Sequence, residues 1–417
     1  MEIIELEERQ FRNYSYIHSN RNIYQTVENA KRLENKYNQK LYLGLIDDQN
    51  NLLAATLLLI SKLKGKYLYG YSPKGFLIDY NNEELLTTFT NKLKEYLKER
   101  KFVFIKLDPL IPYQIYNKEK KIIYQNKNIM PFLKRLGYNH LGFNNYFETH
   151  NSRYCVYLNT NKDSLEDTFK KVSRNVKRSI QNSLNMGITI HKGDINNLDL
   201  FYSLISKKTK LAKEDIQSYF NIYNNNQNNF EVYFAKIDPQ IYVNNYRYLE
   251  REEFKKNNYL YQKIVESNNQ NRKLINKKLV SDKVLQKYKK EIVNATNIYS
   301  KFPNGLIVGT CAIIKNNKEI TFFIDGYEEK LREVHSSYFL KWEIIKKYMK
   351  EGYTLFNLGE ISGNMNKENN KYYGLYFSKM GFNSKVVEYP GEFDLIINSP
   401  LYSIFYNIMY LRSKIQK

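Results

Sequence analysis

A dense cluster of positive charge, between residues 170 and 178, is the first feature of the sequence that could do chemistry. Five cations occur there in nine residues without one acid: Lys170, Lys171, Arg174, Lys177 and Arg178. On a helix they share one face, because Phe169, Val172 and Val176 recur on another. This cationic ridge suits the phosphates of RNA, pyrophosphate or lipid headgroups, and it is equally typical of a solvated face in a Lys-rich protein. Its composition leaves these readings open.

Asp108 is the second candidate for chemistry. It ends an apolar strand, expected at 102–107, immediately before Pro109. Open α/β sheets carry functional groups at the carboxyl ends of their strands, so this carboxylate is placed to act as a general base. An aspartate that merely starts a proline turn is the commoner outcome of such a local sequence.

Several chemistries lack their motif in this sequence. We find no Gly-x-Ser-x-Gly elbow, no P-loop and no Gly-x-Gly-x-x-Gly fingerprint, so hydrolases, NTPases and dinucleotide enzymes have no support. The glycine-rich loop that holds the pyrophosphate of acyl-CoA is also missing. Cys155 and Cys311 lie far apart, and the five histidines show no metal-binding spacing. We therefore expect neither a disulfide framework nor a structural metal.

Length and composition indicate a folded protein with an anionic partner. The 417 residues correspond to two or three domains, and a hydrophobic share of 42% with 15% aromatics excludes a disordered chain. Lys and Arg number 65 against 43 Asp and Glu, a net charge of +22 that favours nucleic acid, anionic lipid or phosphorylated substrates. A general excess of Lys, Asn, Ile and Tyr weakens this clue.

No segment of the sequence is expected to cross a membrane. The longest apolar run, 52–60, falls well short of the roughly 20 residues that a spanning helix needs. The first five residues are acidic and lack the basic and apolar regions of a signal peptide. We expect a cytoplasmic protein.

The elements that must position these residues occur in two similar sets. In the first, a hairpin at 41–63 and a strand at 67–75 precede a helix at 83–98 and the strand that ends at Asp108. In the second, the hairpin lies at 306–324, the helix at 336–350 and the strand at 355–358. A helix that a capping box opens at 163–166 is predicted to run to Met186 and to carry the cationic ridge. The fold class is therefore α/β or α+β.

Between the two sets, residues 246–298 contain no Gly or Pro. Pairs of apolar residues recur there every three to five positions among Lys, Glu and Asn, which is typical of long helices. The polar run 267–271 divides them, so we predict an antiparallel helical hairpin that pairs with itself and shares few core contacts. Two ordinary helices of a compact domain are the alternative.

Five segments, in order along nearly the whole chain, carry a resemblance to a known family. They are SPKGFLIDY (72–80), FIKLDP (104–109), NLGEISG (357–363), GLYFSKMGF (374–382) and VVEYPGEFDL (386–395). Together they resemble the FemABX family of aminoacyl-tRNA-dependent peptidyltransferases, which extend the interpeptide bridge of peptidoglycan precursors.

The resemblance implies two tandem GNAT-like acyltransferase domains with an inserted antiparallel helical arm. The first domain would comprise residues 1–152, with 383–417 packing back on it. The second would comprise 153–244 and 299–382, and the arm 245–298.

The resemblance also implies roles for single residues. Lys379 falls on the family's FK lysine, which is associated with holding the precursor's phosphate or the transition state, and a compact cation suits that role. We take Lys379 and Asp108 as the catalytic pair. The expected substrate-binding residues are Lys31, Lys74, Tyr219 and, on the cationic ridge, Lys170, Arg174 and Lys177. The chain departs from the family where Lys74 replaces an arginine and where 209–213 offers lysine instead of arginine.

The reaction implied is attack by an acceptor amine on the ester that joins an amino acid to tRNA. It forms a peptide bond on the stem or bridge peptide and needs no cofactor besides aminoacyl-tRNA as co-substrate. The partners would be aminoacyl-tRNA and an undecaprenyl-linked or UDP-linked muropeptide precursor, with peripheral contact at the inner membrane face, for a monomer or weak dimer. An acyl-CoA-dependent N-acyltransferase and a non-catalytic RNA- or membrane-surface-binding protein remain alternatives. The amino acid transferred and the bridge position stay open.

Overall fold

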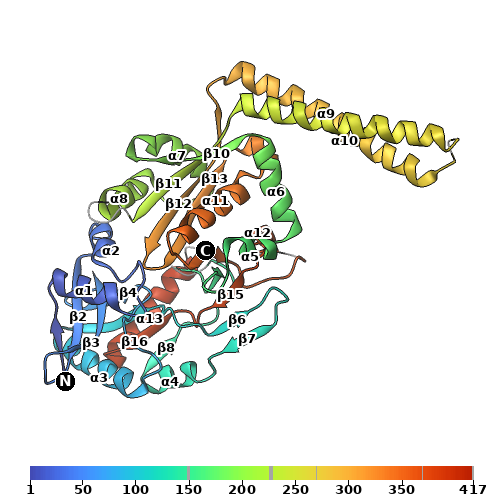
Figure 1. Ribbon diagram of the computed structural model, residues 1–417. Coiled ribbons are helices and arrows are strands. Elements are labelled where there is room, and N and C mark those ends of the chain that lie inside the picture. Colours follow the sequence, from blue (N-terminus) through green and yellow to red (C-terminus); the bar gives the residue numbers. More distant parts are fainter. Residues whose placement is uncertain (148–150, 225–228, 269, 369, 416–417) are drawn as a thin grey trace.

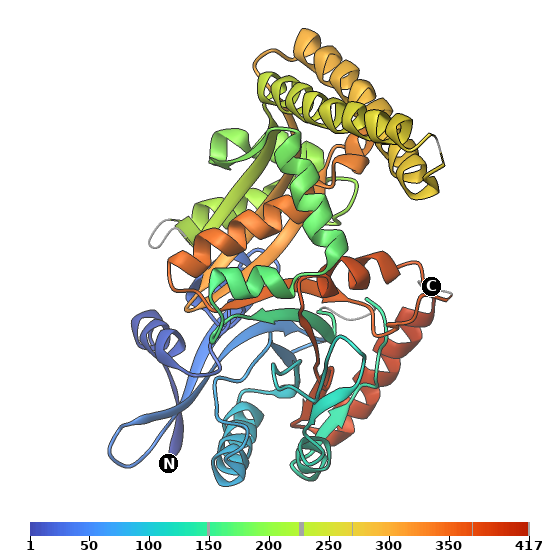
Figure 2. The ribbon, with the colours of Figure 1, turned by 45° about the vertical axis from the view of Figure 1, so that its right-hand side comes forward.

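The computed structural model describes residues 1–147, 151–224, 229–268, 270–368 and 370–415. The body contains two β-sheets, and a pair of long helices projects away from it (Figures 1 and 2). None of the described helices is both long and apolar enough to cross a membrane.

The first sheet has seven strands in the order β1-β2-β3-β4-β5-β16-β8, of which only the β4–β5 pair is parallel. Its strands are β1 (Glu2–Glu5), β2 (Gln39–Ile46), β3 (Leu52–Lys62), β4 (Leu68–Ser72), β5 (Phe102–Leu107), β8 (Tyr138–His140) and β16 (Phe393–Ile396). The helices of this part are α1 (Glu8–Ile17), α2 (Val27–Arg32), α3 (Glu83–Glu99), α4 (Ile129–Arg135) and α13 (Ser399–Ile415).

Helices cover the first sheet on both faces, as one of its inner strands, β3, shows. Side chains alternate along β3, so Leu57 packs with Phe11 of α1 on one face, while Leu58 packs with Phe89 of α3 on the other. This explains why β3 reads as an almost continuous apolar run instead of an alternating pattern.

The second sheet has nine strands in the order β10-β11-β12-β13-β14-β9-β15-β6-β7. Its strands are β6 (Gln114–Tyr116), β7 (Ile122–Gln125), β9 (Tyr154–Asn159), β10 (Ile188–Gly193), β11 (Phe230–Ile237), β12 (Leu306–Asn316), β13 (Glu319–Tyr327), β14 (Leu355–Ile361) and β15 (Lys385–Glu388). The helices of this part are α5 (Leu165–Lys171), α6 (Arg174–Asn185), α7 (Leu198–Ile205), α8 (Lys213–Asn224), α9 (Pro239–Glu266), α10 (Arg272–Lys301), α11 (Ser336–Lys350) and α12 (Tyr373–Met380), with short 3₁₀ turns at Ile195–Asn197 and Glu329–Val334.

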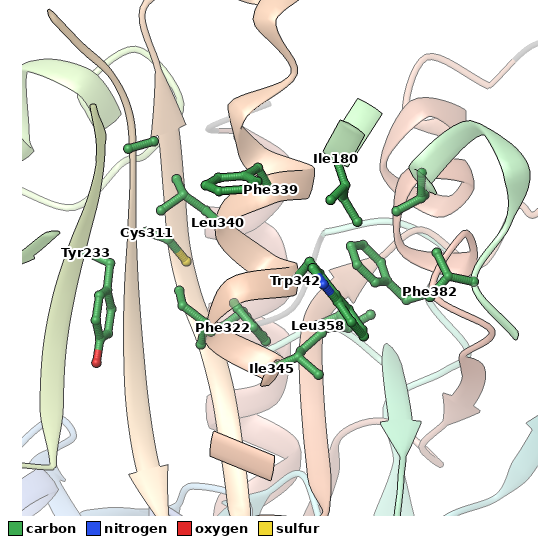
Figure 3. Packing of buried hydrophobic residues seen from close by; sticks show 14 of the residues in the cluster. Ile180, Tyr233, Cys311, Phe322, Phe339, Leu340, Trp342, Ile345, Leu358 and Phe382 are labelled. Carbon is green, nitrogen blue, oxygen red and sulfur yellow. The ribbon is translucent and has the colours of Figure 1, made fainter. Parts of the chain in front are cut away.

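The core of the second part forms where α11 packs on one face of this sheet. Leu340 of α11 points towards Cys311 of β12, the ring of Trp342 lies 4.8 Å from that of Phe169 of α5, and Phe382 approaches from the end of α12 (Figure 3). The other face of the sheet is covered by α7 and α8, through Phe201 and Phe220. Because helices cover both faces of the inner strands of each sheet, the predicted α/β class is confirmed.

The two halves repeat one unit, as the sequence predicted. In each, a strand, a helix and a second, parallel strand follow one another: β4-α3-β5 in the first and β13-α11-β14 in the second. Parallel neighbours require a crossover, and a helix supplies it in both cases.

The chain crosses between the sheets more often than the predicted boundaries require. β6 and β7 precede residue 152 but belong to the second sheet, where β6 pairs with β15 and β7 pairs with β6. β15 pairs with β9, and after only a few residues β16 joins β5 and β8 in the first sheet. The division at 1–152, 153–244 with 299–382, and 383–417 stays a prediction, and strands from both sides of it share a sheet.

The single helix predicted from 163 to Met186 is wrong. α5 ends at Lys171, and the next residue, Val172, has extended backbone. α6 begins at Arg174 after its N-cap Ser173, whose Oγ accepts a hydrogen bond from the amide of Val176 at 3.4 Å. The amide of Ser173 donates to the carbonyl of Gly381 at 2.8 Å. A serine inside a helical pattern can act as an N-cap and start a new helix. The hydrogen bond between Ser173 and Gly381 favours this break over a continuous helix.

The helical hairpin predicted at 245–298 is confirmed, although it is longer. α9 has 28 residues and α10 has 30, so each is about 42 to 45 Å long. In the outer part of the arm, Asn257 Nδ2 donates to Ser281 Oγ at 3.1 Å and to Asp282 Oδ1 at 2.7 Å. Leu260 and Leu285 are buried although this part stands clear of the body, so the two helices cover them (Figure 2).

We expected the arm to share few contacts with the core, but its base is packed into the body. Tyr242, Tyr246 and Ala295 are buried in the main core of the second part. Asn245 Nδ2 also donates to the carbonyl of Asn185, at the end of α6, at 3.2 Å. The hairpin is therefore anchored in the body and becomes self-contained only farther out.

We predict that the outer arm, residues 253–285, can be replaced by a short Gly-Ser turn joining Glu252 to Gln286. The deleted residues are covered by each other, so the shortened protein should melt cooperatively within a few degrees of the parent. Thermal unfolding followed by circular dichroism measures this. Deletion of 239–301 is the matched control, and it should lower solubility or the melting temperature because it opens the core. Equal behaviour of both deletions would contradict the anchored base.

Candidate active site

A cavity of about 730 Å³ lies between the two sheets. Both sheets and four helices contribute to its wall, since Lys74 follows β4, Tyr157 lies on β9, and α2, α8, α11 and α12 add side chains. Seven cations and three carboxylates line it: Arg21, Arg32, Lys36, Lys74, Lys210, Lys341 and Lys379, with Glu319, Asp325 and Glu360. A cavity with such an excess of cations is suited to an anion.

Lys379 reaches this cavity from α12. Its Nζ donates a hydrogen bond of 2.6 Å to the carbonyl oxygen of Glu360. Gly359 makes room for it, because a Cβ on that residue, whose φ is +92°, would lie 3.0 Å from the ammonium. Burial first, and then the positive charge of Lys341, lower the pKa of Lys379 to about 8. The ammonium is thus positive at neutral pH but is poorly compensated.

Lys341 and Asp325 form an ion pair in the same wall. Lys341 Nζ lies 2.6 Å from Asp325 Oδ2, which also accepts a hydrogen bond of 2.6 Å from the hydroxyl of Ser337. Burial would raise the pKa of Asp325, but Lys341 holds it well below its ordinary value, and the same pairing raises the pKa of Lys341. Sequence reasoning missed both residues. The available signal was a lysine on the core-facing side of α11, at the helical spacing of Ile344 and Tyr348.

Lys74 and Asp108 are held together at the junction of the sheets. Lys74 Nζ lies 3.1 Å from Asp108 Oδ2, and the side chains are only 6% and 4% exposed. Asp108 also accepts hydrogen bonds from the Lys74 amide at 2.8 Å, the Tyr71 hydroxyl at 3.3 Å and Asn151 Nδ2 at 2.8 Å. Burial alone would lower the pKa of Lys74, but this carboxylate raises it. Lys74 lines the cavity, whereas Asp108 lies behind it.

The other predicted acceptor residues divide between the cavity and the surface. Tyr219 lines the cavity, and the guanidinium of Arg32 stacks 4.6 Å above its ring. Lys31 lies outside the cavity wall and pairs with Glu8 at 3.0 Å. Adjacent side chains of a helix point about 100° apart, and the next residue, Arg32, lines the cavity where we had expected Lys31.

The cationic ridge lies on α5 and α6, apart from the cavity. Lys170 pairs with Glu166 at 2.8 Å, and Lys177 donates to the Lys170 carbonyl at 2.7 Å. Within the described residues, Arg174 and Arg178 have no ion pair, and both are exposed. The predicted binding roles of Lys170, Arg174 and Lys177 therefore belong to a separate surface, which adjoins α12 through Ser173 and Gly381.

Cys155 also lines the cavity but is unsuited to covalent catalysis. Burial, followed by the nearby Glu360 carboxylate, raises the pKa of its thiol to about 12, so the thiol stays protonated at neutral pH. In the part of the chain that the structure describes, no group of three or more His, Cys, Asp or Glu residues could hold a metal ion. The wall offers cations, carboxylates and hydroxyls as its working groups.

Comparison with known proteins identifies the family. A model described as the FemAB family matches residues 6–410. The chain belongs to the FemAB family. The aminoacyltransferase FemA of Staphylococcus epidermidis is 27% identical over 403 residues, covering 93% of this chain and 95% of that protein. The aminoacyltransferase FemB of the same species is 27% identical over 433 aligned positions and covers both chains completely.

A solved structure shares the fold of this FemAB-family chain. The crystal structure of FemX matches with a TM-score of 0.73 at 20% identity, covering 97% of this chain and 99% of that one. The likeness extends over nearly the whole of both chains, so the overall fold is shared.

We predict that Asp108→Asn destabilises this FemAB-family protein by about 3–5 kcal/mol, because it leaves the Lys74 ammonium buried without its counter-charge. Lys74→Met should cost a similar amount for the reciprocal reason. The double variant should cost clearly less than the sum, since no unpaired charge remains. Urea unfolding of the four proteins measures the coupling, and additive costs would show that the pair does not interact in the folded state.

Proposed function

We propose that this FemAB-family protein transfers an amino acid from aminoacyl-tRNA to an amine on the stem or bridge peptide of a peptidoglycan precursor. The observation that carries the proposal is Lys379 in the cationic cavity between the sheets, in a chain whose relatives FemA and FemB are named aminoacyltransferases. The cavity offers room for the two reacting ends, and we propose that the reaction needs no bound cofactor.

The chemistry follows from the groups in the wall. The acceptor amine, once deprotonated, attacks the ester carbonyl, a C–N bond forms, and the C–O bond to tRNA breaks. The carbonyl oxygen gains negative charge in the transition state, and an ammonium held in a poorly solvated wall stabilises that charge strongly. Lys379 is the residue to which we assign this role. The second proton of the amine passes to the departing tRNA oxygen, which leaves as a hydroxyl.

A carboxylate must take the first proton from the acceptor ammonium. Asp108 stays our predicted base, although its four donors also suit it to hold Lys74 in place. Glu319 is a rival inside the cavity, where burial raises the pKa of its carboxyl and so favours its taking up a proton. Orientation of the two substrates contributes most of the acceleration in either case.

The remaining cations suit the phosphates of the two substrates. Arg32, Lys36 and Lys210 line the cavity and are placed to receive the phosphates of a lipid-linked or UDP-linked precursor. The cationic ridge and the Lys-rich arm are separate surfaces, and we assign them to the tRNA backbone.

Lys379→Met is predicted to abolish transfer without loss of stability. Because the pKa of Lys379 is lowered to about 8, the charged side chain reduces the free energy of unfolding at neutral pH. A neutral methionine removes this destabilisation, and it also removes the positive charge that we assign to catalysis. The assay combines lipid-linked precursor, total tRNA and each radiolabelled amino acid with its synthetase. Wild-type turnover in this variant would overturn the role of Lys379.

A pH profile separates a charge requirement from a steric one. The ammonium of Lys379 is lost as pH rises through about 8, so single-turnover transfer by the wild type should fall above that pH. Lys379→Arg keeps its charge there and should move the fall to higher pH, whatever its absolute rate. If ribonuclease treatment leaves transfer intact and acyl-CoA supports it, the tRNA-dependent proposal fails.

The cationic ridge gives a prediction of its own. Lys170→Ala, Arg174→Ala and Lys177→Ala together should weaken tRNA binding and lower the slope of log affinity against log salt by about 2, as expected for three lost phosphate contacts. Lys62→Ala, Lys64→Ala and Lys66→Ala make the same change in charge at exposed positions, at the end of β3 and just after it, and should leave the slope unchanged. Equal slopes in all three proteins would make the ridge a solvated face.

A further inference from the structure

An exposed ribbon forms the outer edge of the second sheet. β6 and β7 make this ribbon, and Figure 1 shows it at the margin of the body. Ile122, Ile123 and Tyr124 of β7 are 51%, 49% and 45% exposed. Successive side chains of a strand point to opposite faces, so neither face of β7 is covered by the rest of the protein. Three consecutive large apolar side chains exposed to water are typical of an interaction surface.

Two neighbouring segments extend this apolar surface. Phe143 is 50% exposed and its ring stacks 5.7 Å from that of Tyr113, at the start of the ribbon. Phe147 is 39% exposed and lies 5.1 Å from the ring of Tyr372, which precedes α12. On α12 itself, Leu375 and Phe377 are 43% and 48% exposed. We call the whole surface the apolar patch; its members are Ile122, Ile123, Tyr124, Phe143, Phe147, Leu375 and Phe377.

The tip of the ribbon joins these segments and is cationic. Lys120 Nζ lies 3.1 Å from Asn366 Oδ1 and 5.9 Å from the centre of the Tyr376 ring, so the tip reaches the α12 side of the patch. Between residues 114 and 127 there are four lysines and one acid: Lys118, Lys120, Lys121 and Lys127, with Glu119. Aliphatic and aromatic side chains surrounded by lysines are the composition that inserts into an anionic membrane interface.

We propose that the apolar patch docks this protein on an anionic lipid surface. The proposal rests on the proposed function, because docking matters most for an acceptor that is itself anchored in lipid. α12 connects the two: its Leu375 and Phe377 are exposed, while Lys379 of the same helix reaches the cavity. Insertion of the patch would bring the cavity to the headgroup layer, where the phosphates of a lipid-linked acceptor lie.

A second copy of the chain is the competing occupant of this edge. β7 is an edge strand and could pair with itself, but two ribbons of like charge would meet, and the whole chain carries a net charge of +22. β7 has only four residues, so self-pairing would gain few hydrogen bonds against that repulsion. Charge complementarity therefore favours anionic lipid.

The test is flotation of the full chain with vesicles. The wild type should bind vesicles of phosphatidylglycerol and phosphatidylcholine and should not bind phosphatidylcholine alone. Ile122→Ser, Ile123→Ser and Tyr124→Ser together should weaken binding by more than about tenfold. The matched control changes three exposed apolar residues of the arm, Tyr261→Ser, Leu279→Ser and Val280→Ser, and should bind like the wild type. Equal binding by both triple variants, or none by the wild type, overturns the proposal.

A second measurement keeps the proposal testable if the three serine substitutions destabilise the ribbon. Cys155 and Cys311 are buried, so Ile123→Cys provides a single accessible thiol for a polarity-sensitive fluorophore. Its emission should shift to the blue with phosphatidylglycerol vesicles, and an unchanged spectrum contradicts insertion. A dimer in gel filtration that the ribbon variant loses would assign the patch to a second copy instead.

The acceptor form separates this proposal from the proposed function. With a lipid-free precursor, the ribbon variant should transfer as fast as the wild type, whereas with precursor in vesicles it should be more than about tenfold slower. Equal rates in vesicles overturn docking and leave the transferase proposal standing. Absence of transfer by the wild type with either acceptor overturns the transferase proposal, while vesicle flotation still decides whether the patch binds lipid.

Discussion

Burial of charge at the junction of the two sheets is the constraint on which the site depends. An unpaired ion there would cost several kcal/mol, and two buried ion pairs, Lys74 with Asp108 and Arg153 with Glu388, are therefore each held by further hydrogen bonds. Asp108 accepts four hydrogen bonds and fixes Lys74 in the cavity wall. On the other side, Arg153 pairs with the buried Glu388 and donates to the carbonyls of Asn144 and Tyr389. Asn151, which lies just before β9 of the second sheet, donates to Asp108 at the end of β5 in the first, so a shift of one sheet against the other would break this contact.

Lys379 is the cation that this frame leaves under-compensated. Lys74 and Lys341 each contact a carboxylate, whereas the hydrogen bond of Lys379 goes to a carbonyl oxygen. The second positive charge nearby lowers its pKa further. A site built this way gains most when negative charge appears beside it, which is what an ester carbonyl supplies on attack. The stability lost at Lys379 is thus the physical basis of the proposed catalysis.

The regular elements were predictable from the sequence, and the connections between sheets were not. α3 and α11 show helical periodicity, and β3 is one apolar run, because each is buried by one continuous surface. β6 and β15 are three and four residues long and carry no such pattern, so their membership of the second sheet depends on contacts far away in the sequence. The motif resemblance located Lys379 and Lys74, but Asp325, Lys341 and Arg32 become neighbours only through the fold.

The segment 374–395 explains why one stretch of sequence carries so much of the family resemblance. It begins with α12, which brings Lys379 to the cavity, and Gly381 then accepts the hydrogen bond that separates α5 from α6. β15 follows in the second sheet and, after Pro390 and Gly391, β16 enters the first. One short stretch thus positions the proposed catalytic cation, sets the direction of the cationic ridge and joins the sheets. A substitution there alters several contacts at once, so few of its positions are free to vary independently.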